Sequence, residues 1–197
     1  MKIEIIDNKR FADILIDGEK WKKVHRRLYK NHLKEILRIS EKKHLSDLCL
    51  RVDIKLARML VYKWLALRGF MKAELTKKLN SYKIDPRAIA EVLSECEKLG
   101  YLDDKREGRL FIERGKRRGL GPQMITMKLW QKAPELKEMA RGSFTDDEQR
   151  EQIAQWIKKK IRSADLSELK VKQRLYRFLI GKGFDNSLVR EQLLVDE

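Results

Sequence analysis

The pattern of hydrophobic positions recurs three times along this chain of 197 residues. In each copy, apolar residues at helical spacing lead to a glycine, and a second short apolar pattern follows it. The copies cover residues 60–79, 110–129 and 174–193 and align without gaps. A repeat of this kind predicts a fold assembled from several small units of one design.

The aligned glycines, Gly69, Gly119 and Gly183, each follow a basic residue and precede an apolar one. A glycine at that point can take the left-handed conformation that ends many helices, so each copy predicts two helices joined by a tight turn. Asp85 and Pro86 then begin a third helix in the first repeat, because Asp caps helices and Pro fits the first turn. A shorter third helix, over residues 134–140, is predicted in the second repeat.

The pattern therefore predicts a mainly α protein of tandem three-helix-bundle repeats, packed neighbour to neighbour in an elongated, curved array. We expect an N-terminal extension over residues 1–56 and repeats over 57–105, 106–144 and 145–197. The last repeat opens with a capping box at residues 145–148, Thr-Asp-Asp-Glu.

The N-terminal extension has a different pattern. Ile3 and Ile5 precede the turn pair Asp7-Asn8, and a second apolar stretch ends at Asp17-Gly18. These features predict a short β-hairpin. A helix over residues 19–39 is expected behind it, because apolar residues there fall at helical spacing and an isolated hairpin needs a surface to dock on.

The net charge is the feature of the composition that points to a class of partner. The formal net charge is +16, and residues 106–142 hold ten basic and four acidic residues. A polyanionic partner, nucleic acid or nucleoprotein, is the natural expectation. The two cysteines suggest core positions and no disulfide framework, and no signal peptide or membrane-length apolar run occurs. We therefore expect a cytoplasmic protein without membrane contact, and a monomer.

Two basic clusters are the candidate binding residues. In the first, the arginines at 114, 117 and 118 share one helical face, with spacing that suits phosphates or carboxylates. The second lies at the end of the helix that the capping box opens, where the helix dipole alone also accounts for basic residues. The candidates are Arg106, Arg109, Arg114, Lys116, Arg117, Arg118, Lys158, Lys159, Lys160 and Arg162.

Other motifs are weaker. The turn Gly119-Leu-Gly-Pro122 precedes a helix but lacks the Lys-Ser/Thr of a phosphate-binding loop. The three histidines have no partners at metal-ligand spacing, and no nucleophile–base set or catalytic carboxylate pair is supported. We expect no metal, no cofactor and no enzymatic activity.

The motifs in the middle of the chain resemble the signature of the RecX family of regulatory proteins. They are Lys98-Leu-Gly-Tyr-Leu-Asp-Asp104, then Phe111-Ile112, then Gly119-Leu-Gly-Pro-Gln-Met-Ile125 with Leu129. The resemblance covers about residues 57–194, and its flanks include residues 178–184, Phe-Leu-Ile-Gly-Lys-Gly-Phe. The chain departs from the family pattern at Trp130-Gln-Lys-Ala-Pro134 and at Gly115.

The resemblance implies tandem three-helix repeats and a non-catalytic modulator of the RecA recombinase in DNA recombination, repair and the SOS response. Its partners would be the RecA nucleoprotein filament and single- or double-stranded DNA, with inhibition of ATPase, strand exchange and co-protease activity. Two alternatives stay open. One is a general nucleic-acid-binding protein that acts without RecA, and the other is a helical scaffold for an acidic protein.

Overall fold

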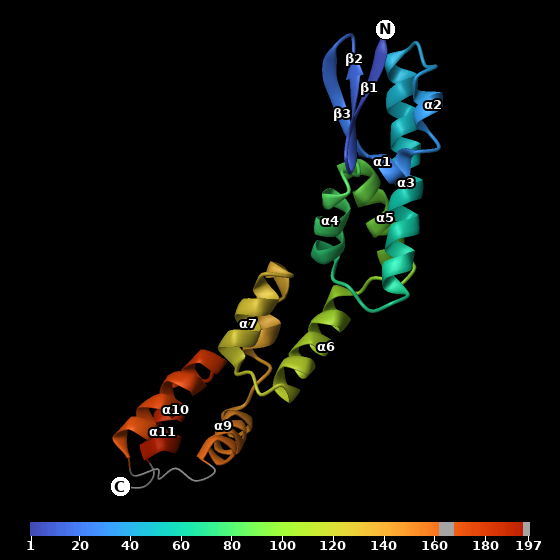
Figure 1. Cartoon of the computed structure of the whole chain (residues 1–197). Helices are drawn as coiled ribbons and strands as arrows, with labels where there is room; N and C mark the ends of the chain where they lie inside the picture. The colour runs from blue at the N-terminus through green and yellow to red at the C-terminus, as the bar shows by residue number, and fades with distance from the viewer. Residues whose placement is uncertain (162–167, 195–197) are drawn as a thin grey trace. The chain divides into compact units, whose positions relative to one another are not determined.

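The computed structural model of the chain describes residues 1–161 and 168–194 (Figure 1). It divides into two compact units, Met1–Asp103 and a second that begins at Asp104. The described residues are mostly helical, with a small sheet at the N-terminus, so the predicted fold class is confirmed. The expected division into four segments stays a prediction, and its first boundary, between residues 56 and 57, falls inside a helix.

The first unit contains three strands followed by helices (Figure 1). The strands are β1 (Ile3–Asn8), β2 (Phe11–Ile16) and β3 (Glu19–His25). The helices are α1 (Arg26–Tyr29), α2 (Leu33–Ile36), α3 (Lys42–Leu65), α4 (Lys72–Ser81) and α5 (Pro86–Lys98).

The N-terminal sheet corrects two predictions. It has three antiparallel strands in the order β1-β2-β3, not two, and no helix runs over residues 19–39. Asp17 and Gly18 both have positive φ, 51° and 85°, as in the two-residue turns that join antiparallel strands. The chain therefore turns back along β2, and Val24 pairs with Ala12 in the buried layer of the sheet. Only the short helices α1 and α2 remain of the expected long one.

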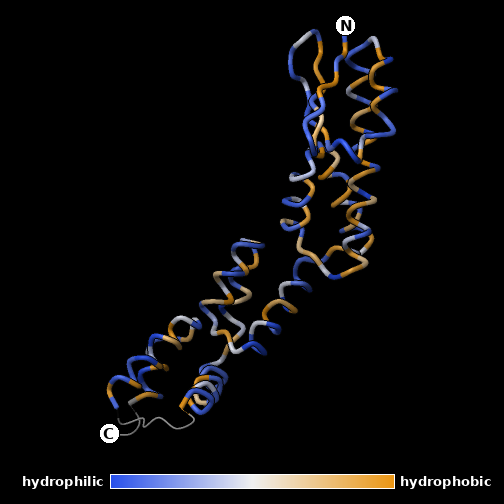
Figure 2. Tube along the Cα trace, in the orientation of Figure 1, coloured by the Kyte–Doolittle hydropathy of each residue, from blue (hydrophilic) through white to orange (hydrophobic). Residues whose placement is uncertain are grey.

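Helix α3 is the central element of the first unit. Figure 2 shows apolar residues recurring along it with polar residues between them, as expected for a helix with one buried face. Its buried residues join those of α5 in one core, which also includes Ile14 and Val24 of the sheet. Sheet and helices of this unit are therefore held by a single hydrophobic core.

Asp53 of α3 connects the sheet to this core through polar contacts. Its carboxylate is fully buried and accepts hydrogen bonds from Lys22 Nζ at 2.7 Å, from the Tyr29 hydroxyl and from the backbone N–H of Asp85 at 3.0 Å. Burial and the negative charge of Asp53 raise the pKa of Tyr29 well above its usual value, so the hydroxyl stays a donor. One carboxylate thereby joins β3, α1 and the start of α5.

The second unit contains two groups of helices (Figure 1). The first group is α6 (Asp104–Arg117), α7 (Pro122–Trp130), the short 3-10 helix η1 (Pro134–Leu136) and α8 (Lys137–Arg141). The second group is α9 (Asp146–Ile161), α10 (Leu169–Lys182) and α11 (Asn186–Leu194).

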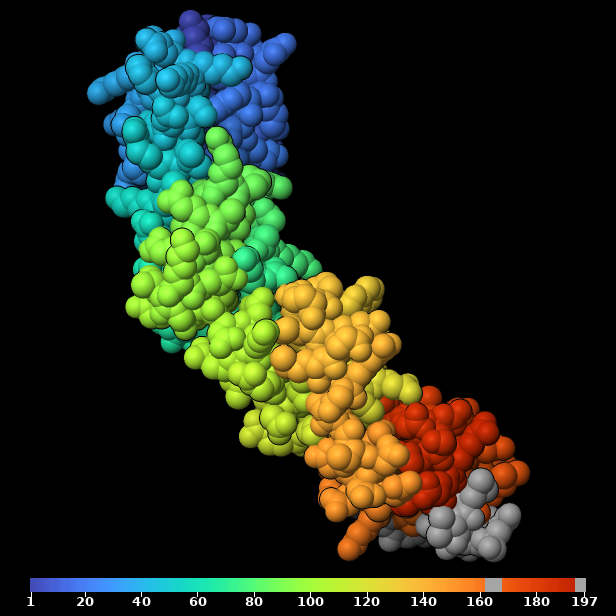
Figure 3. All heavy atoms as spheres, turned by 180° about the vertical axis from the view of Figure 1, so that it is seen from behind, coloured from blue at the N-terminus to red at the C-terminus, as the bar shows by residue number. Residues whose placement is uncertain are grey.

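Each of these groups packs as a three-helix bundle. Helix α7 packs against α6 and α8, and α9 packs against both α10 and α11. In the space-filling view, the red atoms of α10 and α11 lie directly against the orange atoms of α9 (Figure 3). The core of the last bundle is formed around Ile153, Leu179 and Phe184. Helix α9 therefore completes this bundle together with α10 and α11.

The three repeated glycines differ in backbone conformation. Gly119 and Gly183 have positive φ, 65° and 88°, and end α6 and α10 as predicted. Gly69 is not among the left-handed residues, because α3 ends earlier, at Leu65. The apolar residues six positions after the glycines, Leu75, Ile125 and Val189, are all buried.

Candidate functional site

The first predicted cluster lies along α6 and just past its end. Arg114, Arg117 and Arg118 are exposed, as expected for one face of a helix that can meet a ligand. Arg106 and Arg109 are also exposed, but in the first half of α6. Arg109 and Arg118 are nine positions apart, about 13 Å along a helix. A ligand at the C-terminal end of α6 would therefore meet the three later arginines first.

Lys116 is far less exposed than Arg114, although Arg114 also has a carboxylate partner, Glu107 at 3.8 Å. The Lys116 amine lies 3.0 Å from a Glu148 carboxylate oxygen, and its side chain is 16% exposed. It also lies against the Phe144 ring, 4.6 Å from the ring centroid. Lys116 therefore holds the end of α6 against the start of α9 and is less available to a ligand than the arginines around it.

Glu148 has a second function in the same place. Its carboxylate accepts a hydrogen bond from the backbone N–H of Thr145 at 3.0 Å, and the Thr145 hydroxyl accepts one from the Glu148 backbone N–H at 3.2 Å. This is the predicted capping box of α9. The Thr145 N–H and then the Lys116 amine lower the pKa of Glu148, so the carboxylate is charged at neutral pH.

A groove of about 600 Å³ opens between the end of α6 and one face of α9. It is lined by Lys116, Arg117, Arg118, Gly119, Glu148, Glu151, Gln152, Gln155, Trp156 and Lys159. The structure thus brings residues of both predicted clusters to one surface. The two carboxylates in the groove, one of them already paired with Lys116, leave its charge positive.

Trp156 is the side chain that fixes this groove. Its indole N–H donates a hydrogen bond to the carbonyl oxygen of Gly119 at 2.9 Å. Any Cβ at Gly119 would overlap the indole ring, so glycine serves both the turn and the close approach. Lys159 and Lys182 lie 5.2 Å and 4.6 Å from the Trp156 ring, within the range of cation–π attraction.

Three of the four residues of the second predicted cluster lie in α9. Lys158, Lys159 and Lys160 are exposed in the last turn of α9, and the Lys160 amine lies 4.7 Å from the centroid of the Phe178 ring. Of these lysines, only Lys159 lines the groove. Arg162 lies outside the described residues.

Lys182 is a residue of this region that sequence reasoning missed. It reaches both Trp156 and Phe178, with its amine 4.6 Å and 5.5 Å from the ring centroids. A signal was present, because Lys182 precedes the repeated glycine of the last copy, as Arg118 does in the second. Its side chain could be placed near Trp156 only once the packing of α9 on α10 was known.

The arrangement can bind anions but shows no catalytic constellation. Guanidinium groups pair with phosphates and carboxylates through two parallel hydrogen bonds, whereas lysine amines act as point charges. Within residues 1–161 and 168–194, no group of His, Cys, Asp and Glu could hold a metal ion. In the same residues, no helix combines the length and the apolar character that a membrane crossing requires.

Comparison with known proteins identifies similar sequences. Residues 146–193, which contain α9, α10 and all but the last residue of α11, match the family described as "RecX, third three-helix domain". "Regulatory protein RecX" of Acinetobacter baylyi is 26% identical over 136 residues, covering 69% of this chain and 85% of that protein. The protein of the same name from Serratia proteamaculans is 32% identical over 106 residues, covering 51% of this chain and 61% of the relative.

Two solved structures share the fold. The crystal structure of RecX from Lactobacillus salivarius aligns with a TM-score of 0.65 at 20% identity, over 73% of this chain and 96% of the other. A second crystal structure, of a regulatory protein RecX, aligns with a TM-score of 0.66 at 19% identity, over 99% and 98% of the two chains. At these identities the likeness concerns the fold alone.

Proposed function

Because this chain belongs to the RecX family of regulatory proteins, we propose that it binds RecA filaments assembled on DNA and inhibits them. The inhibited activities would be ATP hydrolysis, strand exchange and co-protease function. The family membership is the observation that carries the proposal. Relatives named regulatory proteins also favour a binding protein over an enzyme.

The charge distribution supports this function. A RecA–DNA filament is a polyanion, and the net charge of +16 would attract the protein to it. The basic groove gives that attraction a specific place, since Arg117 and Arg118 of one bundle and Lys159 of the next share it. Net charge alone would bring the protein near the filament, and the groove would select its orientation.

We assign the filament contact to the arginines at the end of α6, Arg114, Arg117 and Arg118, with Lys159 beside them. Arg106 and Arg109 extend the basic surface along the same helix, and Lys158 and Lys160 extend it in the last turn of α9. Arg162 is proposed as a contact from the sequence alone. Lys116 acts indirectly, because its pairing with Glu148 holds α6 and α9 together.

The experiment that tests this function is ATP hydrolysis by preformed RecA filaments on single-stranded DNA, with this protein titrated at near-physiological salt. Inhibition well below one molecule per RecA would indicate action at filament ends. Inhibition only near one per RecA would indicate occupancy along the filament. No inhibition at saturating protein, with RecA from the same host, would overturn the proposal.

A second function is favoured by the same charge. The protein could bind nucleic acid without RecA, through the lysines and arginines around Trp156. Binding of that kind loses affinity with rising salt, by roughly 0.9 log units per phosphate contact for each tenfold increase. Tight, salt-dependent binding to DNA, together with unchanged RecA ATPase, would select this function over the first.

A further inference from the structure

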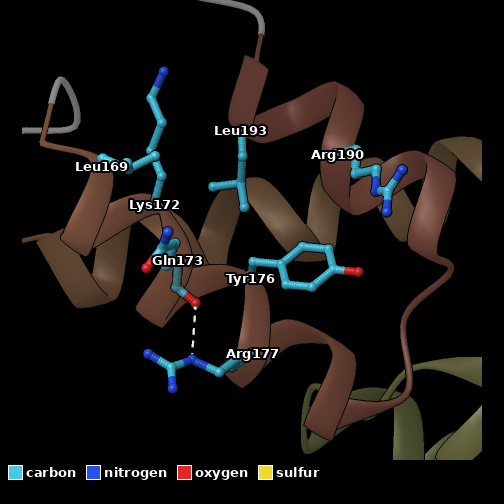
Figure 4. Close-up of a pocket in the computed structure, with 7 residues that line it drawn as sticks. All are labelled: Leu169, Lys172, Gln173, Tyr176, Arg177, Arg190 and Leu193. Carbon is cyan, nitrogen blue, oxygen red and sulfur yellow. Dashed lines mark hydrogen bonds between the residues drawn. The ribbon is translucent and has the colours of Figure 1, made fainter.

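A second pocket lies in the last bundle, between α10 and α11, and shares no residue with the basic groove. Its volume is about 510 Å³. Figure 4 shows its lining residues, five from α10 and two from α11. They are Leu169, Lys172, Gln173, Tyr176, Arg177, Arg190 and Leu193.

The interior of the pocket is apolar. Leu193 forms part of the hydrophobic core of this bundle, and Leu169 is 68% exposed at the first position of α10. The Tyr176 side chain of α10 points toward α11 (Figure 4). Its hydroxyl donates a hydrogen bond to Asn186 Oδ1 at 2.9 Å. That bond restrains the ring beside the two leucines and so reduces the ordering that a ligand would have to impose.

The rim of the pocket is cationic. Lys172, Arg177 and Arg190 surround it, and none of its lining residues is acidic. In the part of the chain that the structure describes, no carboxylate lies within ion-pair distance of these three cations. Arg177 instead donates to the backbone carbonyl of Gln173 at 3.4 Å.

Arg150, in the same bundle, does have carboxylate partners. Arg150 of α9 pairs with Glu191 of α11 at 3.1 Å and with Asp147 at 3.0 Å. Elsewhere in the chain, Arg58 pairs with Glu95, Lys72 with Glu97 and Lys116 with Glu148. Ion pairs between helices therefore occur in both units, and Lys172, Arg177 and Arg190 take part in none of those described.

We propose that this pocket binds an acidic, amphipathic segment of a partner protein, with apolar side chains in the pocket and carboxylates on the rim. An amphipathic helix presents both groups at once, at spacings of three and four residues. Nucleic acid fits the rim but not the interior, because two leucines offer nothing to a sugar–phosphate backbone. The apolar interior therefore selects a protein segment over a DNA strand.

The test uses a labelled probe peptide and the full chain. The probe is a fluorescein-labelled helical peptide of roughly 14 residues, with leucines at i, i+3, i+4 and i+7 and glutamates beside them. Two control peptides replace either every leucine by serine or every glutamate by glutamine. We expect the probe to bind, by fluorescence anisotropy, and both controls to bind at least about tenfold more weakly.

Variants locate the binding. Lys172→Glu with Arg190→Glu should weaken probe binding at least about tenfold, because two attractive charges become repulsive. The matched control is Lys170→Glu with Arg174→Glu, which makes the same charge change on exposed residues of α10 outside the pocket. That control should change the affinity by less than about twofold. Leu169→Ser should also weaken binding, and Leu67→Ser, at a residue 78% exposed in the first unit, should not.

Three results would overturn the proposal. The serine peptide could bind as tightly as the probe, or the matched control could lose as much affinity as the pocket variant, and either would reduce the interaction to general charge. The pocket variant could also lose affinity for an oligothymidylate selectively, which would make the pocket a nucleic-acid site. Because no RecA is present in the assay, its outcome is independent of the proposed function.

Discussion

The backbone N–H of Gly121 donates a hydrogen bond to the carbonyl oxygen of Lys182 at 2.8 Å. A second bond, from the Gln123 N–H to the Gly183 carbonyl oxygen at 3.0 Å, lies beside it. The turn of the second repeat and the turn of the third are thus in backbone contact. This contact fixes the backbone of Lys182 relative to the end of α6. The Lys182 amine, which lies 4.6 Å from the Trp156 ring, is thereby held beside the groove.

Gly121→Ala should destabilise the second unit. A Cβ at Gly121 would overlap the backbone of Gly183 and Phe184, which cannot move as a side chain could. We expect a loss of about 1–3 kcal/mol in the free energy of unfolding, measured by urea denaturation of the full chain. Gly181→Ala is the control, because nothing lies within 4 Å of a Cβ there and alanine favours the helix by about 0.5–1 kcal/mol. Equal stability of Gly121→Ala and the wild type would contradict the close contact.

Asp53→Ala should destabilise the first unit more than an ordinary surface change. It would remove the carboxylate that Lys22, with a side chain 15% exposed, and the Tyr29 hydroxyl share. Among the described residues, Lys22 would keep only the Asp85 carboxylate at 3.8 Å, and Tyr29 only the Cys49 carbonyl oxygen at 3.2 Å. Removing one partner of a buried ion pair costs about 3–5 kcal/mol. Asp47→Ala, at an exposed position of the same helix, should change the free energy by less than about 0.5 kcal/mol. Chemical denaturation of both variants provides the comparison, and similar costs would show that the Asp53 contacts contribute little.

Acid should weaken the caps of α5 and α11. Hydrogen bonds from Arg87 lower the pKa of Asp85, and those from Ser187 lower the pKa of Asp185. A carboxyl with a lowered folded pKa contributes stability that is present above its unfolded pKa, about 3.9, and is lost as pH falls through the folded pKa.

Asparagine at both positions tests this pH dependence. Asn caps helices about as well as Asp but does not titrate. The double variant Asp85→Asn with Asp185→Asn should therefore lose less stability than the wild type between pH 6 and pH 3, measured as urea midpoints. An identical loss in both proteins would assign the acid sensitivity to other carboxyls.

Reversing Arg114, Arg117 and Arg118 to glutamate should weaken inhibition of RecA filaments. We expect the concentration for half-inhibition to rise at least roughly tenfold, because rim charges govern association with a polyanion. Reversal of Lys42, Lys43 and Lys55, exposed on α3, makes the same change in net charge and should have a smaller effect. Helical circular dichroism should be unchanged in both variants. If the two triple variants inhibit equally, the α6 arginines are not the contact.

The helices of the repeats could be predicted because each buries one face. Ile89, Val92 and Cys96 fall at spacings of three and four residues, and all three are buried on α5. Strand β3 was missed because Trp21 and Val24 lie three residues apart and so fit a helical spacing too. The turn at Asp17-Gly18 was the stronger signal, since both residues adopt positive φ and reverse the chain.

The candidate site was predictable only within single helices. Arg114 and Arg117 belong to α6 and Arg118 directly follows it, and all three are exposed. The pairing of Lys116 with Glu148 and the contact of Lys182 with Trp156 depend on how α9 packs, which no local pattern encodes. Sequence therefore identified the cations but not which of them hold the bundles together.

Glu148 serves two structures at once, as the cap of α9 and as the partner of Lys116. A substitution at position 148 would disturb both, whereas one at position 116 would leave the cap intact. We therefore expect position 116 to vary more among relatives than position 148. Lysine at 116 should be replaced in some relatives that keep glutamate at 148. Glutamate at 148 should be replaced only where another residue caps α9. Comparing how often each position changes in an alignment of relatives would test this expectation.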